Sequence, residues 1–205
     1  MRGRFIVLEG IDGSGTTTQA RRLVEALRAR GHTCLQTAEP SGGEVGRLIR
    51  AQLSTRGDAR PDPRALALLF AADRLDHVAR EIEPALAAGA TVVCDRYVVS
   101  SWAYQSLDFP ADWVRAINAH APWPDLTLWI DLPVAEAQRR IHARSDRDGT
   151  PVELFDAHSV QARVATAYGD ILADPELSSV VRIDGTAPLD AVAAAVLAAV
   201  EPAPG

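Results

Sequence analysis

The sequence of 205 residues contains no lysine, and all 21 of its basic residues are arginines. Aspartate and glutamate together number 27, which gives a formal net charge of −6. Such a chain lacks the overall positive field of a general DNA- or RNA-binding protein, so we expect no nucleic-acid partner. A polyanionic ligand would have to be bound by arginines that cluster at one place.

Cysteine and long apolar runs are also scarce. Two cysteines, Cys34 and Cys94, cannot build a disulfide framework, and we expect both as buried thiols in a reducing compartment. No apolar stretch is long enough to span a bilayer, and the run near the first residue is too short for a signal peptide. We therefore expect a cytoplasmic protein with no membrane partner.

Hydrophobic residues nevertheless make up 47% of the chain, which is enough to bury a core. The expected strands are 4–9, 33–37, 91–95, 126–131 and 179–184. The expected helices are 17–30, 46–53, 64–88, 111–119, 134–144, 160–173 and 189–200. Nearly continuous apolar strands separated by helices predict a doubly wound α/β fold, with helices on both faces of a five-stranded parallel sheet. Its ligands should bind at the carboxyl ends of the strands.

No repeat or linker divides the chain, so we expect a single domain over residues 1–205. The polar stretch 145–151 predicts a short lid at about 145–152. Residues 201–205 are typical of a frayed tail.

A glycine-rich loop follows the first expected strand. It comprises Gly10, Ile11, Asp12, Gly13, Ser14, Gly15, Thr16, Thr17 and Thr18. Its backbone N–H groups and the start of the next helix would bind phosphate oxygens, and we predict an ATP-binding loop here. The segment matches G-x-x-x-x-G-K-[ST] except that Thr16 replaces the lysine. Thr17 occupies the position of the hydroxyl that ligates Mg²⁺.

The missing lysine leaves two interpretations open. A cation about 4 Å from a phosphate charge contributes roughly 4 kcal/mol at an effective dielectric constant near 20. Its uncompensated loss would slow catalysis by about two to three orders of magnitude. Either arginine, Mg²⁺ and backbone amides replace the charge, or the fold binds nucleotides without transferring phosphate.

The third expected strand ends in Asp95 and Arg96. A carboxylate beside the phosphate loop suits Mg²⁺, and the guanidinium next to it can bind an acceptor phosphate through two parallel N–H groups. An ordinary surface ion pair would give the same dipeptide.

Two further pairs have helical spacing. Phe70 and Arg74 could stack on a base and hydrogen-bond its carbonyl, or be a core phenylalanine and a solvated arginine. Ser101 and Gln105, with Tyr104 beside them, could contact the polar edge of a base, or form an ordinary helix surface.

Four arginines precede or lie within the expected lid: Arg139, Arg140, Arg144 and Arg147. Such a run is usually a solvated helix face. Opposite a phosphate loop without its lysine, the run could instead close over the transferring phosphoryl group. We expect Arg144 and Arg147 to do so.

The motifs together resemble the bacterial thymidylate kinase family along nearly the whole chain. The matching segments are 5–15 (FIVLEGIDGSG), 39–40 (EP), 47–50 (RLIR), 70–74 (FAADR), 95–105 (DRYVVSSWAYQ) and 124–133 (PDLTLWIDLP). The resemblance implies a P-loop kinase fold and Mg²⁺-dependent transfer of the γ-phosphoryl group of ATP to dTMP, giving dTDP and ADP. It also implies a homodimer.

The resemblance assigns roles to residues of the acceptor site, with Glu39 among them. Asp12 resembles the loop carboxylate near the sugar and phosphate of the acceptor, and Arg50 and Arg96 resemble the clamps on its phosphate. The same resemblance implies contacts to the thymine and its sugar from Phe70, Arg74, Ser101, Tyr104 and Gln105. Phe70 would stack on the base, Arg74 would bond its carbonyl, and Tyr104 would line the sugar pocket.

The sequence departs from the family pattern at Thr16, at Ala38, where many relatives carry Arg, and in the lid segment. Gly13 stands where some relatives carry a loop Arg. Two alternatives to a dTMP kinase stay open: a weak or silent nucleotide-binding regulator, and a deoxynucleoside kinase or another nucleoside monophosphate kinase.

Overall fold

The computed structural model describes residues 2–53, 61–148, 158–174, 177 and 179–201. These residues form a five-stranded parallel sheet in the order β2-β3-β1-β4-β5. The strands are β1 (Phe5–Glu9), β2 (Cys34–Ala38), β3 (Thr91–Asp95), β4 (Leu126–Asp131) and β5 (Val180–Asp184). The predicted fold class is confirmed, and each strand lies within one residue of its expected bounds at either end.

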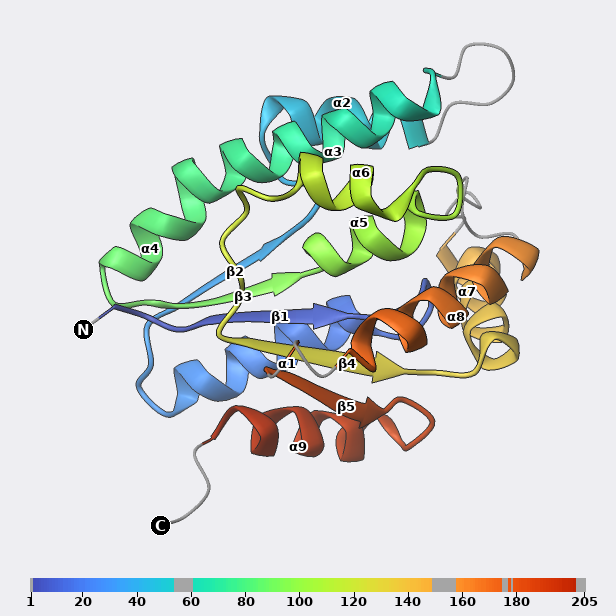
Figure 1. Ribbon diagram of the computed structural model, residues 1–205. Coiled ribbons are helices and arrows are strands. Elements are labelled where there is room, and N and C mark those ends of the chain that lie inside the picture. The colour runs from blue at the N-terminus through green and yellow to red at the C-terminus, as the bar shows by residue number, and fades with distance from the viewer. Residues whose placement is uncertain (1, 54–60, 149–157, 175–176, 178, 202–205) are drawn as a thin grey trace.

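The helices of the described residues cover both faces of the sheet (Figure 1). They are α1 (Thr16–Ala29), α2 (Glu44–Leu53), α3 (Pro63–His77), α4 (Glu83–Ala87), α5 (Val98–Gln105), α6 (Ala111–Ile117), α7 (Val134–Asp148), α8 (His158–Leu172) and α9 (Leu189–Val200).

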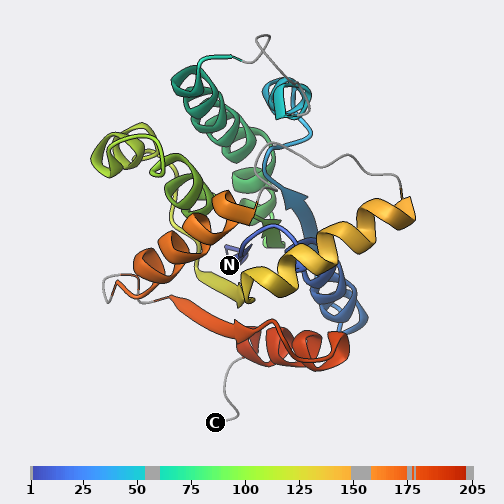
Figure 2. The same ribbon diagram turned by 90° about the vertical axis from the view of Figure 1, so that its right-hand side faces the viewer.

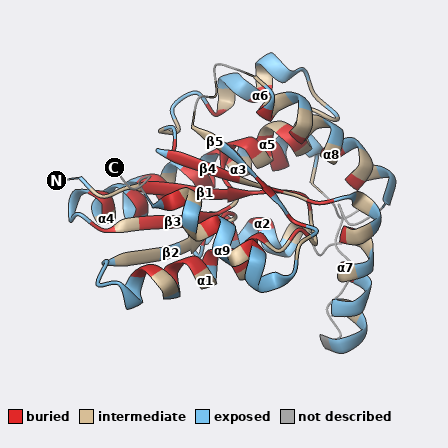
Figure 3. Ribbon diagram, turned by 90° about the horizontal axis from the view of Figure 1, so that it is seen from below, coloured by how far each residue is buried: buried red, intermediate tan, exposed pale blue. Residues whose placement is uncertain are grey.

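Successive side chains of β1 point to opposite faces of the sheet, so the core has two layers. Phe5 and Val7 pack in a buried cluster with residues of α4, α5 and α8. Ile6 and Leu8 pack on the opposite face with residues of α1 and α9. Since β1 is buried on both faces, it reads as a continuous apolar run in the sequence, and Figure 3 shows it as buried throughout.

The expected helix 64–88 is interrupted. α3 ends at His77, a π-helical turn runs over Val78–Ile82, and α4 begins at Glu83. Pro84 has no N–H group, and its ring would clash with the carbonyl four residues earlier in a regular α-helix. The wider π-turn immediately before Pro84 accommodates both effects.

Two other helices differ from expectation. α5 was absent from the expected helices, because Val98 and Val99 continue the β-branched composition of β3. α7 extends to Asp148 instead of ending at Arg144, so residues 145–148 of the expected lid are helical. The apolar periodicity stops at Arg144 because the last turn is largely exposed and needs no apolar face. The rest of the expected lid and positions 202–205 of the expected tail lie outside the described residues.

The carboxyl ends of all five strands point to the edge of the sheet where α7 and α8 lie (Figures 1 and 2). This arrangement places the loops after β1 and β3 at one edge, as a doubly wound fold predicts.

No helix among the described residues is long and apolar enough to cross a membrane. Both cysteines are free, but only Cys94 is buried; Cys34 is half-buried because β2 is an outer strand.

Candidate active site

The glycine-rich loop adopts a conformation that its glycines permit. Gly13 and Gly15 have φ angles of 83° and 97°, in the left-handed region that side chains disfavour. A Cβ atom at Gly13 would also lie 2.5 Å from the carbonyl oxygen of Ala137 in α7. A larger side chain at position 13 therefore does not fit this loop without a shift of the backbone.

The loop leads directly into α1, whose hydrogen bonding includes the bond from the N–H group of Gln19 to the carbonyl of Gly15. The N–H groups of Thr16, Thr17 and Thr18 belong to the first turn, which has no intrahelical acceptors. They can bind anionic oxygens, and the helix dipole favours negative charge at the same place.

A cavity of about 700 Å³ opens over this helix start. Its lining residues are Asp12, Gly13, Ser14, Gly15, Thr16, Thr17, Thr18, Gln19, Arg96, Arg140, Ile141, Arg144, Gly185, Thr186, Ala187, Pro188, Leu189 and Val192. All predicted loop residues except Gly10 and Ile11 line it. The loop between β5 and α9, which forms the opposite wall, was not foreseen from the sequence.

Of the basic side chains that the structure describes, three line this cavity, and all three are guanidinium groups. Arg96 comes from the end of β3, and Arg140 and Arg144 lie one turn apart on α7. Arg140 donates to Glu136 at 2.9 Å and to the carbonyl of Gly185 at 3.0 Å, which ties α7 to the far wall. Arg147 lies in the same helix but is not among the lining residues. The structure thus brings Arg144, but not Arg147, to the cavity wall.

The two predicted Mg²⁺ ligands lie together. The hydroxyl of Thr17 donates to Oδ2 of Asp95 at 2.5 Å, and Asp95 is buried. Oδ1 of Asp95 has no hydrogen-bond partner among the described residues. A buried carboxylate oxygen without a partner beside a hydroxyl is a donor set that suits a hard divalent cation.

Arg96 and Asp12 form the junction between the loops after β3 and β1. Nη2 of Arg96 lies 2.5 Å from Oδ1 of Asp12, while Oδ2 of Asp12 accepts from Tyr104 at 3.0 Å and from Gln161 at 2.7 Å. Gln161, in α8, also accepts from the backbone N–H of Asp12 at 3.2 Å. Asp12 is held by three side chains and is therefore suited to orienting a ligand.

The backbone of Arg96 is unusual because its φ angle is 67°. A left-handed conformation costs a non-glycine residue roughly 1–2 kcal/mol, so surrounding contacts must hold it. Burial lowers the pKa of the Arg96 guanidinium, but the charges of Tyr104, Asp12 and their neighbours raise it well above its usual range. Arg96 is a permanent cation at this site.

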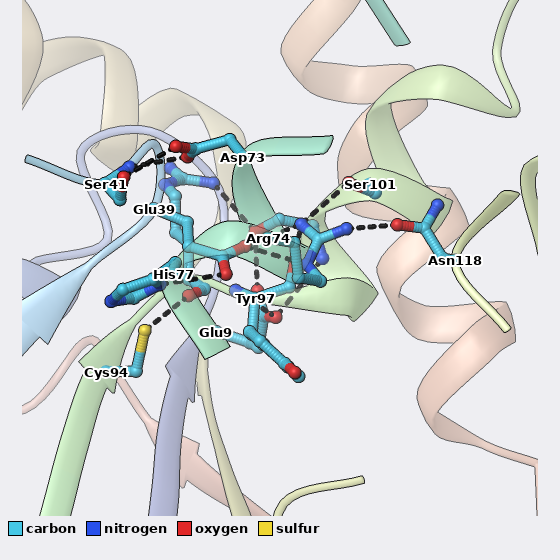
Figure 4. A network of polar contacts seen from close by, with 12 residues as sticks. Glu9, Glu39, Ser41, Asp73, Arg74, His77, Cys94, Tyr97, Ser101 and Asn118 are labelled. Carbon is cyan, nitrogen blue, oxygen red and sulfur yellow. Dashed lines mark hydrogen bonds and ion pairs between the residues drawn. The ribbon is translucent and has the colours of Figure 1, made fainter. Parts of the chain in front are cut away.

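Arg74 and Glu39 form a buried ion pair at 2.7 Å, shown in Figure 4. Arg74 is 1% exposed and also donates to Asn118, to the carbonyl of Tyr97 and to Ser101. Its guanidinium therefore faces protein acceptors on all sides. The predicted contact from Arg74 to a base would require one of these bonds to be exchanged.

His77 joins the same buried cluster. Its Nδ1 lies 3.2 Å from Glu39, and its Nε2 lies 2.7 Å from Thr37 and 3.2 Å from Glu81. Burial lowers the pKa of His77, but the hydrogen bond and charge of Glu39, with the charges of Glu81 and Asp73, raise it by more. The pKa of His77 therefore lies above its usual value of 6.5.

The remaining predicted acceptor residues do not line the cavity. Phe70 is half-buried on α3, and Gln105 is half-buried on α5, with its Oε1 lacking a partner among the described residues. Ser101 is buried, and its hydroxyl accepts from Arg74. Arg50 donates to the carbonyls of Pro40 and Ser41, beside the cis Glu39-Pro40 bond.

Comparison with known proteins decides the family. The family model described as thymidylate kinase matches residues 8–196. The chain belongs to the thymidylate kinase family. It is 46% identical to a probable thymidylate kinase of Pyrococcus horikoshii, with 82% of each chain covered. It is 40% identical to the thymidylate kinase of Desulfosudis oleivorans over 98% of this chain and 97% of that one. The thymidylate kinase of Rhizorhabdus wittichii is 44% identical over 84% of this chain and 85% of its own.

Membership of the thymidylate kinase family confirms the predicted family, fold class and enzyme class, a nucleoside monophosphate kinase.

The site contains residues that the sequence did not reveal. Gln161 contacts Asp12 from 149 positions away, and Arg140 lines the cavity although only its neighbours towards the lid were favoured. The only sequence signal for either residue was a polar side chain within an expected helix, α7 for Arg140 and α8 for Gln161.

Proposed function

We propose that the chain transfers the γ-phosphoryl group of ATP to dTMP, giving ADP and dTDP. Family membership supports the reaction. The observation that carries the residue assignment is Arg96, which lines the phosphate-loop cavity and is bonded to Asp12. A cation at this junction faces both nucleotides where they meet.

The donor triphosphate binds on the first turn of α1. Backbone N–H groups of Thr16, Thr17 and Thr18 receive its oxygens, and the loop between β5 and α9 holds the base end of the cavity. Arg144 approaches from α7 and neutralises negative charge that the missing lysine would otherwise balance.

Thr17 and Asp95 would hold Mg²⁺, since the unpartnered Oδ1 of Asp95 provides a free anionic ligand. A bound Mg²⁺ supplies charge neutralisation at the phosphate oxygens. Within the described residues no cluster of three His, Cys, Asp or Glu side chains could hold a metal, so phosphate oxygens and water would complete its ligands.

The acceptor nucleotide binds on the other side of Arg96. Its phosphate meets Arg96 and Arg50, its sugar lies against Tyr104 and Asp12, and its base lies near Phe70, Ser101 and Gln105. The acceptor phosphate is already ionised near neutral pH and needs no strong base, so Asp12 orients the acceptor instead of removing a proton.

The chain also forms a homodimer in the cytoplasm under this proposal. Leu48 on α2 and Leu68 and Leu75 on α3 are 42 to 49% exposed, and the last two are seven residues apart on one helix face. A second copy would cover these side chains. Light scattering of the wild type and of Leu68→Glu/Leu75→Glu tests this: a dimer should become a monomer, and a monomeric wild type contradicts it.

The reaction is tested by ADP release from ATP and Mg²⁺ with a panel of acceptors: dTMP, dUMP, other nucleoside monophosphates and thymidine. Turnover with dTMP is expected. Thymidine turned over in preference to dTMP would indicate a deoxynucleoside kinase. A flat trace with every acceptor at high enzyme concentration would leave a nucleotide-binding protein without transferase activity.

A further inference from the structure

A buried carboxylate at the end of β1 has no contact with the cavity described above. Glu9 is fully buried and accepts four hydrogen bonds. The donors are the backbone N–H groups of Tyr97 at 3.0 Å and Ser100 at 3.2 Å, the hydroxyl of Ser100 at 2.6 Å and that of Tyr168 at 2.9 Å. Figure 4 shows Glu9 beside Tyr97. Three elements, β1, α5 and α8, therefore meet at one side chain.

Glu9 caps α5 from outside the helix. Tyr97 is the N-cap residue of α5, and its own side chain makes no capping hydrogen bond. Glu9 accepts from the N–H group of Ser100, a first-turn group that the side chain of an N-cap residue would normally satisfy, and also from the N–H group of Tyr97 itself. The negative charge also lies at the positive end of the helix dipole.

The same bonds fix the unusual backbone of Arg96. Its own N–H group donates to the carbonyl of Leu8 at 2.9 Å, and the next N–H group, of Tyr97, donates to Glu9. The φ and ψ rotations of Arg96 lie between these two N–H groups. Since Leu8 and Glu9 are consecutive residues of β1, one rigid strand holds both sides of the left-handed residue.

The network also reaches the guanidinium. Nη1 of Arg96 lies 3.4 Å from the hydroxyl of Ser100, which itself donates to Glu9. Ser100 and Tyr168 hydroxyls are 2.7 Å apart, so α8 supports the same point. The direction of the Arg96 side chain is thus determined at its backbone and near its charged end.

We propose that Glu9, Ser100 and Tyr168 are positioning residues that aim Arg96 at the acceptor phosphate. They touch no nucleotide themselves. The inference rests on the proposed function, in which Arg96 binds that phosphate. It explains why a buried acid that contacts no oppositely charged side chain among the described residues lies next to the phosphate loop.

The test compares Ser100→Ala and Tyr168→Phe with Tyr97→Phe. Tyr97→Phe is the matched control, because the Tyr97 hydroxyl is buried without a partner among the described residues and its backbone N–H is retained. Ser100→Ala and Tyr168→Phe should lower kcat/KM for dTMP by about tenfold and weaken dTMP binding in calorimetry, with KM for ATP changed less than about twofold. Tyr97→Phe should change none of these.

A double-mutant cycle separates positioning from general support of the fold. Combined with Arg96→Ala, Ser100→Ala should cause no further loss in kcat/KM or in dTMP affinity, because the group that it positions is gone. Losses that multiply, equal losses for ATP and dTMP, or an effect of Tyr97→Phe as large as that of Tyr168→Phe would overturn the inference.

The kinetics and binding of Arg96→Ala distinguish a failure of the proposed function from a failure of the positioning inference. If Arg96→Ala itself leaves dTMP turnover and binding intact, the role of Arg96 is wrong and the positioning inference falls with it. If Arg96→Ala impairs both while Ser100→Ala and Tyr168→Phe do not, only the inference fails. A wild type that neither turns over nor binds dTMP overturns both.

Discussion

Nη2 of Arg96 lies 2.5 Å from Oδ1 of Asp12, although the two residues are 84 positions apart in the chain. The contact exists because β1 and β3 are adjacent parallel strands, so the loops that follow them leave the sheet side by side. It links the phosphate loop to the side of Arg96 on which we propose that the acceptor binds. A preorganised cation of this kind is what transfer between two anionic nucleotides requires.

Arg96→Ala should lower kcat/KM for dTMP by about two to three orders of magnitude, since under the proposed function it removes a cation that binds the acceptor phosphate. Steady-state kinetics with dTMP varied at saturating ATP measures the loss. Arg21→Ala is the matched control, because Arg21 is exposed and pairs only with Glu25 in α1 among the contacts described. Equal kinetics for the two variants would show that the site is misassigned.

Arg144→Ala should mainly reduce turnover, by about a hundredfold, because we propose that its charge acts on the transferring phosphoryl group. Arg147→Ala should cost less than about tenfold, since Arg147 does not line the cavity. Rates at saturating ATP and dTMP distinguish the two. Arg139→Ala controls for the loss of an arginine from α7, as Arg139 is exposed and pairs with Glu136. A larger effect of Arg147→Ala than of Arg144→Ala would reverse the assignment.

Thr16→Lys should raise turnover by less than about fivefold if, as proposed, arginines and backbone N–H groups already neutralise the phosphates. Thr16 lines the cavity, so a lysine side chain can extend into it. The measurement is kcat with KM for ATP. A gain of about a hundredfold would mean that the native site lacks a charge that nothing replaces.

His77 should make stability depend on pH. Its pKa is raised in the folded state, so its contribution is complete below the unfolded value of 6.5 and is lost as the pH rises through the folded pKa. Urea unfolding from about pH 5.5 to about pH 9 should show this loss in the wild type and a flatter profile in His77→Gln. His120→Gln, an exposed position, should retain the wild-type profile. A wild-type profile in His77→Gln would contradict the assignment.

The strands and the phosphate loop were predictable because their signals are local. The apolar run Phe5–Leu8 predicts a strand without reference to the rest of the chain, and all five residues of β1 are buried in the structure. The loop from Gly10 to Thr18 carries its glycines and hydroxyls in one contiguous segment. The break at Pro84 had a visible cause, but its form as a π-turn depends on packing of the whole helix.

Contacts between distant elements were not predictable. Glu9 meets Tyr168 across 159 positions, and Asp12 meets Gln161 across 149, and neither α8 residue belongs to a recognisable motif. Burial of Arg74 was missed for a related reason. Its four-residue spacing from Phe70 placed both on one helix face, where Arg74 would either bind a base or be solvated. Instead, Glu39 and Asn118 come from distant parts of the sequence to neutralise and enclose it.

The central claim is that guanidinium groups replace the absent lysine, and a double-mutant cycle between Thr16→Lys and Arg144→Ala tests it most directly. Single-turnover transfer from ATP to dTMP would be measured for the wild type, both single variants and the double variant. If Arg144 supplies the missing charge, Thr16→Lys should recover most of the activity lost in Arg144→Ala while adding little to the wild type. Independent effects, with the same loss from Arg144→Ala in both backgrounds, would contradict the account.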